Sequence, residues 1–430
     1  MRPITSALLS SLLLASTARL VIAEIFHLYG HSSPVLHLTQ LSPKQVCPVN
    51  TDAITSTSFP WTHNPTCIDI ILPNSVVTTK ETFCVYTNSL FAGGRGISLI
   101  TTPDVASSYV LESFSHEDQE DRGELPYEAR VTPNRGIGLF AKQDIPAGDS
   151  VMVKHPVLIM AKDLVDERLR RERESLLKIA VRQLPEKTSA TFRNLAKSMG
   201  GDVLDDVVHT NSIGMKIGGN VPHLGIVPEA ARINHACRPN AYYRIDDYEL
   251  KLEVFALKTI KPGDELTFSY GYSRHDHATR QTLIKENWGF TCTCPLCTSP
   301  APTLSTSDSR LSEIASIKAV LPTGAENIPQ LIAILPNLIE LLDEEDLPIE
   351  RPMYEEILAY SWSTMGMEER AKYWAGRARR GWEVVAGRES WEVKRTGELE
   401  GDVRGHATWA TWDKDPWDDG QWEDDDHHEH

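Results

Sequence analysis

The sequence predicts an α+β protein, and three observations indicate this class. Short runs of β-branched and aromatic residues, separated by Pro, Gly and Asn turns, fill most of the chain before Tyr270. Helical periodicity interrupts these runs within residues 161–204 and returns over residues 310–387. Three cysteines lie close together between the two regions, as Cys-x-Cys-x2-Cys. We therefore expect small β-sheets with a helical insert, a cysteine-rich segment and a helical C-terminal domain.

The N-terminal residues resemble a secretory signal peptide over residues 1–23. A short basic start precedes the apolar run Ala7–Ala15, and small residues stand before Glu24. The run is too short, and too interrupted by Arg19, for a good transmembrane helix, and no later stretch is long enough. We therefore expect no membrane span once the signal is removed.

Other features of the chain favour a reducing compartment. No Asn-x-Ser/Thr acceptor with an allowed middle residue occurs, which is unusual for a secreted protein of 430 residues. Clustered thiols that could hold zinc also fit a reducing compartment better than an oxidising one. The secretory pathway and the nucleus or cytoplasm thus both stay open as locations.

Residues 24–112 are expected to form a separate β-rich module. Strand-like runs alternate here with turn residues, and an acidic stretch, Glu112 to Glu124, follows them. Cys47, Cys67 and Cys84 lie in this region, and their connectivity cannot be read from spacing. The module carries no catalytic constellation. We therefore expect a chain that starts near Gly123 to retain whatever the later motifs bind.

The cysteines outside this module predict a structural zinc site. Such a site takes four thiolates in a tetrahedron, and the short cluster supplies only three, so that a distant fourth is needed. The predicted ligands are Cys237, Cys292, Cys294 and Cys297. A zinc ion between these segments would pin residues 286–298 over whatever Asn234 and His235 bind. Unrelated core or disulfide cysteines are the alternative, which three cysteines in six residues disfavour.

Four sequence blocks together resemble the SET-domain family of protein-lysine methyltransferases. They occur in the family's order: Arg135-Gly-Ile-Gly-Leu-Phe-Ala141, Asn234-His-Ala-Cys-Arg-Pro-Asn240, Gly263-Asp-Glu-Leu-Thr-Phe-Ser-Tyr270 and the cysteine cluster. The resemblance implies a SET domain over residues 127–272, built of small sheets in a knot-like arrangement, and a post-SET zinc segment. The likeness is to the SMYD group, but the helical insert has no cysteine, so the MYND zinc finger of that group is absent.

The resemblance implies S-adenosylmethionine as cofactor and a lysine side chain of a protein, with histones among the candidates, as substrate. Tyr270 matches the catalytic tyrosine. The positions that match cofactor contacts are Arg135, Gly136, Gly138, Asn211, Asn234, His235 and Phe290. The chain departs from the SMYD pattern at Trp288, where a tyrosine or phenylalanine is expected, which leaves the number of transferred methyl groups open. A SET-derived scaffold without activity is the alternative, as is an exported, disulfide-bonded protein.

The charge of the chain is compatible with a basic protein substrate. The net charge of −17 disfavours direct contact with nucleic acid. Much of it comes from a disordered acidic tail expected over residues 400–430, since Asp413 to His430 carries nine acids against one lysine. We expect a monomer.

A helical domain is expected between the cysteine cluster and this tail, after a linker at residues 299–309. The predicted helices cover residues 311–321, 329–342, 352–365 and 368–385, with a resemblance to one tetratricopeptide repeat. Pro336 should kink or split the second of them.

Overall fold

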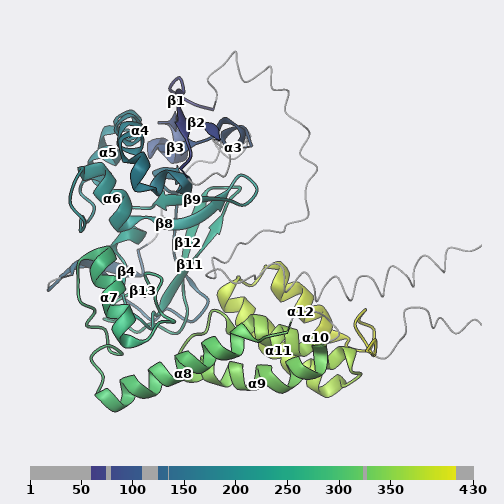
Figure 1. Ribbon diagram of the computed structural model, residues 1–430. Helices are drawn as coiled ribbons and strands as arrows, with labels where there is room; N and C mark the ends of the chain where they lie inside the picture. Colours follow the sequence, from purple (N-terminus) through teal and green to yellow (C-terminus); the bar gives the residue numbers. More distant parts are fainter. Residues whose placement is uncertain (1–59, 74–78, 109–123, 134, 323–326, 413–430) are drawn as a thin grey trace, which may run out of the picture. The chain divides into compact units, whose positions relative to one another are not determined.

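The computed structural model describes residues 60–73, 79–108, 124–133, 135–322 and 327–412 (Figure 1). It confirms the predicted α+β class. The described residues fall into two compact units, which meet in the sequence between Asp308 and Ser309. The predicted signal peptide and residues 413–430 of the predicted acidic tail lie outside the described residues.

The first unit is built on a six-stranded sheet. Its strands, in spatial order, are β1 (Thr66–Ile71), β2 (Lys80–Asn88), β3 (Ile97–Thr101), β7 (Leu158–Ala161), β9 (Val221–Ile226) and β8 (Ile213–Ile217). Neighbouring strands are antiparallel except β3 and β7, which are parallel. Two short helices, α2 (Phe91–Gly94) and α3 (Pro103–Ser107), flank β3 in the sequence. The sheet therefore joins strands from both sides of the acidic stretch.

This sheet corrects the expectation of a separate module over residues 24–112. Alternate residues of β2 enter two cores: Phe83 and Val85 pack on one face of the sheet, Cys84 and Tyr86 on the other. Each core also contains residues from beyond position 127. The described part of the module is thus not independent, because both faces of β2 and the outer edge of β3 are covered by later parts of the chain.

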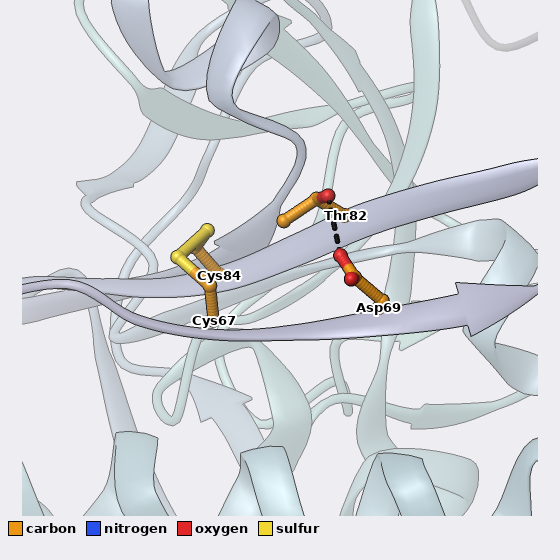
Figure 2. The surroundings of a disulfide bond; sticks show 4 residues. All are labelled: Cys67, Asp69, Thr82 and Cys84. Carbon is orange, nitrogen blue, oxygen red and sulfur yellow. Dashed lines mark hydrogen bonds between the residues drawn. A yellow bond between two sulfur atoms is a disulfide. The ribbon is translucent and has the colours of Figure 1, made fainter.

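A disulfide joins the two outermost strands at this end of the sheet. Cys67 and Cys84 stand opposite each other in the β1–β2 register and are bonded, with their Cα atoms 4.0 Å apart (Figure 2). Two residues after Cys67 on β1, the Asp69 side chain accepts a 2.7 Å hydrogen bond from Thr82 of β2. The structure thus selects one of the pairings that the sequence left open, and Cys47 lies outside the described residues.

The helical insert covers one face of the six-stranded sheet. It consists of η2 (Lys162–Val165), η3 (Glu167–Leu169), α4 (Arg170–Gln183), α5 (Glu186–Arg193) and α6 (Val203–Asn211). Leu176, Leu177 and Ala180 of α4 are fully buried in the core with Phe83. The insert runs past its predicted end at residue 204, because the Asp202 side chain caps α6 by accepting from the backbone N–H groups of the first turn.

The predicted small sheets pack on the opposite face. They are the β11 (Ala241–Asp246), β12 (Lys251–Ala256) and β6 (Ser150–Lys154) sheet, the β4 (Tyr127–Thr132) and β5 (Gly136–Ala141) hairpin, and the β10 (Asn234–His235) and β13 (Thr267–Phe268) pair. Buried residues of all three share one core with the six-stranded sheet, among them Leu139, Val254 and Phe268. After the turn η4 (Ala230–Arg232), β10 lies parallel to β13, so that two distant motifs become adjacent.

The second unit consists of packed helices. They are α8 (Ala301–Ala319), which begins in the first unit, α9 (Ile328–Glu344), α10 (Arg351–Thr364), α11 (Glu368–Val385) and α12 (Trp391–Gly401). Helix α8 replaces most of the predicted linker at residues 299–309. Helix α9 passes through Pro336 without a break, because this residue lies on the exposed side, where water can satisfy the freed carbonyl.

Two tryptophans extend the second unit into the predicted tail. Trp409 and Trp412 pack against its hydrophobic core, and the backbone N–H of Trp412 donates to Thr364 of α10. The expectation of disorder from residue 400 is therefore corrected for residues 400–412. Among the described residues, no helix combines the length and apolar character needed to cross a bilayer.

Candidate active site and metal centre

The four predicted zinc ligands come together in the first unit. Their Sγ atoms all lie within 4.8 Å of one another, with Cys237 at 3.5 Å from Cys297 and 3.9 Å from Cys292. Four sulfurs at about 2.3 Å from a zinc ion lie about 3.8 Å apart. Three of the cysteines are buried and Cys294 is half-buried. The donor set, its spacing and its shielding all fit a tetrahedral metal ion.

Helix α7 (His277–Trp288) holds the three-cysteine segment in place. The Gln281 side chain exchanges two 2.9 Å hydrogen bonds with the backbone of Cys292. Gly289 ends the helix in the left-handed region at φ 73°, which reverses the chain toward the cysteines. Ile284 packs directly on them.

A buried cation lies on the same side of α7. Arg280 stands one turn before Ile284 and is fully buried, and its Nε and Nη2 have no partner among the described residues. Its third nitrogen, Nη1, donates to the His275 carbonyl and lies 4.0 Å from the Asp308 carboxylate, which offsets part of the buried charge.

Tyr270 is anchored to the segment that precedes Cys237, the first cysteine of the cluster. Its hydroxyl donates to the Ile233 carbonyl at 3.0 Å, and its backbone N–H donates to Nδ1 of His235 at 3.1 Å. Burial raises the pKa of Tyr270, and the Glu265 carboxylate adds to this shift. The side chain is therefore a neutral phenol whose oxygen lone pairs remain available.

His235 lies between Tyr270 and the cysteine cluster. Its ring centroid is 5.1 Å from that of Tyr270 and 6.3 Å from that of Phe290, and Nε2 lies 3.4 Å from Sγ of Cys237. Burial lowers the pKa of His235 to about 4, against the opposing effect of the Cys294 thiolate. The imidazole is thus neutral near pH 7.

Glu265, which was not among the predicted site residues, connects several of them. One carboxylate oxygen accepts from Nδ2 of Asn234 at 2.8 Å and the other from Arg135 at 2.7 Å. The side chain is only 14% exposed, which is unusual for a glutamate. Glu265 occurs within the Gly263–Tyr270 block, but a glutamate directly after Gly-Asp equally suits a solvated position, so the sequence did not distinguish it from a surface residue.

The two glycines of the β5 strand have different roles. Gly136 has φ 72°, a left-handed conformation that favours glycine, and a Cβ there would meet no atom within 4 Å. At Gly138 a Cβ would lie 2.6 Å from Glu265 and 3.0 Å from the Asn234 amide nitrogen. Gly136 therefore leaves open space along the backbone, and Gly138 lets the Glu265–Asn234 pair approach the strand.

Aromatic rings gather around Tyr270. Its ring centroid lies 5.1 Å from Trp288 and 6.5 Å from Phe290, and Trp288 in turn lies 5.8 Å from Tyr272. All four rings are half-buried. The Trp288 indole N–H donates to the Thr210 carbonyl at 3.2 Å. The two hydroxyl groups of this aromatic group belong to Tyr270 and Tyr272.

Asn211 lies next to this group but is held by its own surroundings. Its Nδ2 donates to the carbonyls of Ala196 and Val207, both at 2.8 Å, and the residue is 7% exposed. The amide nitrogen therefore fixes the end of α6. By contrast, Glu265 links Asn234 to Arg135, and His235 and the β10–β13 pair hold Tyr270 beside them.

Comparisons with known proteins identify the class of this region. Residues 136–271 match the SET domain. The chain therefore contains a SET domain over these residues. Its described strands β5 to β13, with the helical insert, supply this domain.

The relatives are SMYD-like and SET5-like lysine methyltransferases. The histone-lysine N-methyltransferase set5 of Schizosaccharomyces pombe is 26% identical over 178 residues, which cover 40% of this chain and 52% of that protein. Human N-lysine methyltransferase SMYD2 is 34% identical over 27% of this chain and 26% of its own length. Human protein-lysine N-trimethyltransferase SMYD5 is 39% identical over 16% of this chain and 17% of its own length. The chain thus spans about half, or less, of these relatives.

A solved structure of the human SETMAR methyltransferase domain also matches. It is 19% identical, covers 34% of this chain and 45% of that domain, and has a TM-score of 0.22. The SMYD-like assignment depends on the sequence relatives and not on this likeness.

Proposed function

We propose that this protein transfers methyl groups from S-adenosylmethionine to a lysine side chain of a protein substrate. The observation that carries the proposal is the convergence of Tyr270, His235 and the Asn234–Glu265–Arg135 chain beside a four-cysteine cluster, within a SET domain. The names of the related proteins, which are histone-lysine and protein-lysine methyltransferases, support the same class of substrate.

The proposed cofactor site lies along the start of β5. When bound, S-adenosylmethionine would supply a sulfonium methyl group, which a neutral lysine amine takes up by direct displacement of S-adenosylhomocysteine. The open backbone at Gly136, the Asn234 amide and the Phe290 ring are the groups that would hold it. Glu265 keeps Asn234 and Arg135 in position for this task. Asn211 remains in the proposed set through its side-chain oxygen and backbone.

The proposed lysine channel is formed by the aromatic group. Tyr270, Tyr272 and Trp288 provide half-buried, apolar walls. Such walls disfavour the charged ammonium, so an entering lysine loses its proton more readily and can act as a nucleophile. The Tyr270 hydroxyl donates its hydrogen bond to the Ile233 carbonyl and so presents its oxygen lone pairs elsewhere, where they stabilise positive charge as it moves to the amine.

Removal of Glu265 should weaken cofactor binding. In Glu265→Ala we expect the dissociation constant for S-adenosylhomocysteine, measured by calorimetry, to rise about tenfold, because Asn234 and Arg135 lose a charge-assisted partner. Glu253→Ala is the matched control, since this glutamate forms a similar pair with Arg244 on the β11–β12 sheet. Equal affinity in Glu265→Ala and the wild type would contradict a positioning role.

The cysteine cluster is proposed to bind one zinc ion per chain. In Cys294→Ser we expect metal analysis to show clear loss of zinc, and residues 286–298 to lose protection from amide exchange, because metal binding and local folding are coupled. Cys67→Ser should keep its zinc, since it changes a cysteine outside the cluster. Full zinc content in Cys294→Ser would show that the ligands are assigned incorrectly.

The proposed activity is tested by incubating the purified protein with labelled S-adenosylmethionine, a panel of histones and a cell lysate. Label on a lysine of any protein, found by mass spectrometry, supports the proposal. Binding of the cofactor without transfer to any protein would favour the scaffold alternative.

A further inference from the structure

We infer that His235 is a positioning residue that makes the location of Tyr270 depend on metal occupancy of the cysteine cluster. The inference rests on the proposed function for its purpose, but its evidence is the hydrogen bonding of one imidazole ring. The residue was expected only as a cofactor contact. Its side chain instead has a partner at each nitrogen, and the two partners belong to the two different centres.

The first contact fixes the protonation of the ring. The backbone N–H of Tyr270 can only donate, and it points at Nδ1 from 3.1 Å. Nδ1 must therefore carry the lone pair, and the single proton of the neutral ring is on Nε2. The geometry thus selects one tautomer without reference to the metal.

The second contact connects this proton to a metal ligand. Nε2 lies 3.4 Å from Sγ of Cys237, within hydrogen-bonding distance for sulfur. A thiolate is a stronger acceptor than a thiol, and the sulfur is held as a thiolate when it coordinates zinc. Metal binding therefore strengthens the Nε2–H···S hydrogen bond and restrains the ring.

The restrained ring acts on Tyr270 because it accepts one of the two hydrogen bonds that this residue donates. The Tyr270 hydroxyl donates to Ile233 and its backbone N–H to His235, so both of its donors are held by the segment that ends at Cys237. The His235 side chain is 5% exposed and packs against the Tyr270 ring, so solvent does not readily replace it. Loss of the metal loosens Cys237, then His235, and then Tyr270.

Two substitutions separate the two ends of this link. In His235→Asn the side-chain oxygen can occupy the position of Nδ1 and accept from Tyr270, but the side chain is too short to reach Cys237. In His235→Gln the amide nitrogen can occupy the position of Nε2 and donate to the sulfur, but the Nδ1 acceptor is lost. His223→Asn is the control, because His223 is equally buried and its nitrogens contact Thr101 and the Val221 carbonyl.

Zinc affinity is measured by competition with a chromogenic chelator. We expect His235→Asn to bind zinc about 10–100-fold more weakly than the wild type, as is usual when a neighbour of a ligand is lost. His235→Gln and His223→Asn should stay within about threefold of the wild type. Equal affinities in the two His235 variants would overturn the inference.

Exchange of the Tyr270 amide is measured with zinc and after its removal. In the wild type, zinc removal should speed exchange at least tenfold, and the same treatment should change exchange much less in both His235 variants. His223→Asn should respond like the wild type. A wild-type response in both His235 variants would show that the ring only fills space.

A measurement on the unsubstituted protein covers the case in which a variant does not fold. Long-range proton–nitrogen NMR spectra of the wild type should show His235 protonated at Nε2, with a shift of that nitrogen when zinc is removed. Protonation at Nδ1, or no zinc in the protein, overturns the inference. None of these readouts needs methyl transfer, so failure of the proposed activity is detected separately.

Discussion

A chain that begins at Gly123 is expected not to fold, contrary to what the motifs alone predict. The truncation removes β1 to β3, half of the strands of the six-stranded sheet. Five apolar side chains in these strands are fully buried, namely Phe83, Val85, Ile97, Leu99 and Ile100. Burial of each contributes about 1.5–3 kcal/mol. Their loss, about 7–15 kcal/mol, equals the entire stability of a typical domain.

Circular dichroism and thermal melting of the truncated and full-length chains test this expectation. Point variants in the full chain act as matched controls. Leu99→Ala should lower the free energy of unfolding by about 2–5 kcal/mol. Ile71→Ala, at a β1 position that is 60% exposed, should change it by less than about 0.5 kcal/mol. A truncated chain that melts cooperatively and binds S-adenosylmethionine like the full chain would contradict the shared core.

Tyr270→Phe is expected to reduce the rate of methyl transfer by about 10²–10³, the usual result of deleting one preorganised contact in a transition state. Cofactor affinity should stay within about twofold, because the proposed cofactor contacts are other residues. The Ile233 carbonyl loses its donor, so the free energy of unfolding should fall by about 1 kcal/mol. The reading of Tyr270 as an ordinary strand tyrosine predicts the same loss of stability without the loss of rate.

A mass-spectrometric methylation assay beside calorimetry separates these effects. Tyr243→Phe is the matched control, since Tyr243 is a tyrosine of the same core whose pKa burial raises to about 12. Asn234→Ala should differ from both, because it should weaken cofactor binding itself. An unchanged rate and methyl count in Tyr270→Phe would remove its proposed role.

The clustering of the four cysteines and the residues around Tyr270 could be predicted because each motif is local. Three cysteines within one short segment require a fourth ligand, and Cys237 was the candidate beside other marked residues. The fold class could likewise be predicted, because the hydrophobic periodicity changes from that of strands to that of helices. The hydrogen bonds that Asn234 makes with Glu265, and His235 with Tyr270 and Cys237, could not be predicted, because bonds between distant segments leave no local pattern.

The errors in the domain boundaries have a common physical cause. The strand pattern at residues 97–101 is the same whether β3 ends a module or pairs with β7, and only the long-range pairing distinguishes the two. In the same way, the acidic surroundings of Trp409 and Trp412 resemble a solvated tail, although both rings pack on a hydrophobic core. The composition of the surrounding sequence predicted a solvated tail and a separate module, whereas tertiary contacts determine the structure of these residues.

The parallel pairing of β3 with β7 also sets an order of events on the ribosome. Synthesis of the 57 residues from Thr101 to Leu158 takes roughly 3–11 s at about 5–20 residues per second. Throughout this time, the outer edge of β3 carries unpaired backbone groups beside apolar side chains, which is a template for association with other nascent chains. Newly made chains therefore need either protection by a chaperone or low local concentration until Leu158–Ala161 has emerged to close the edge.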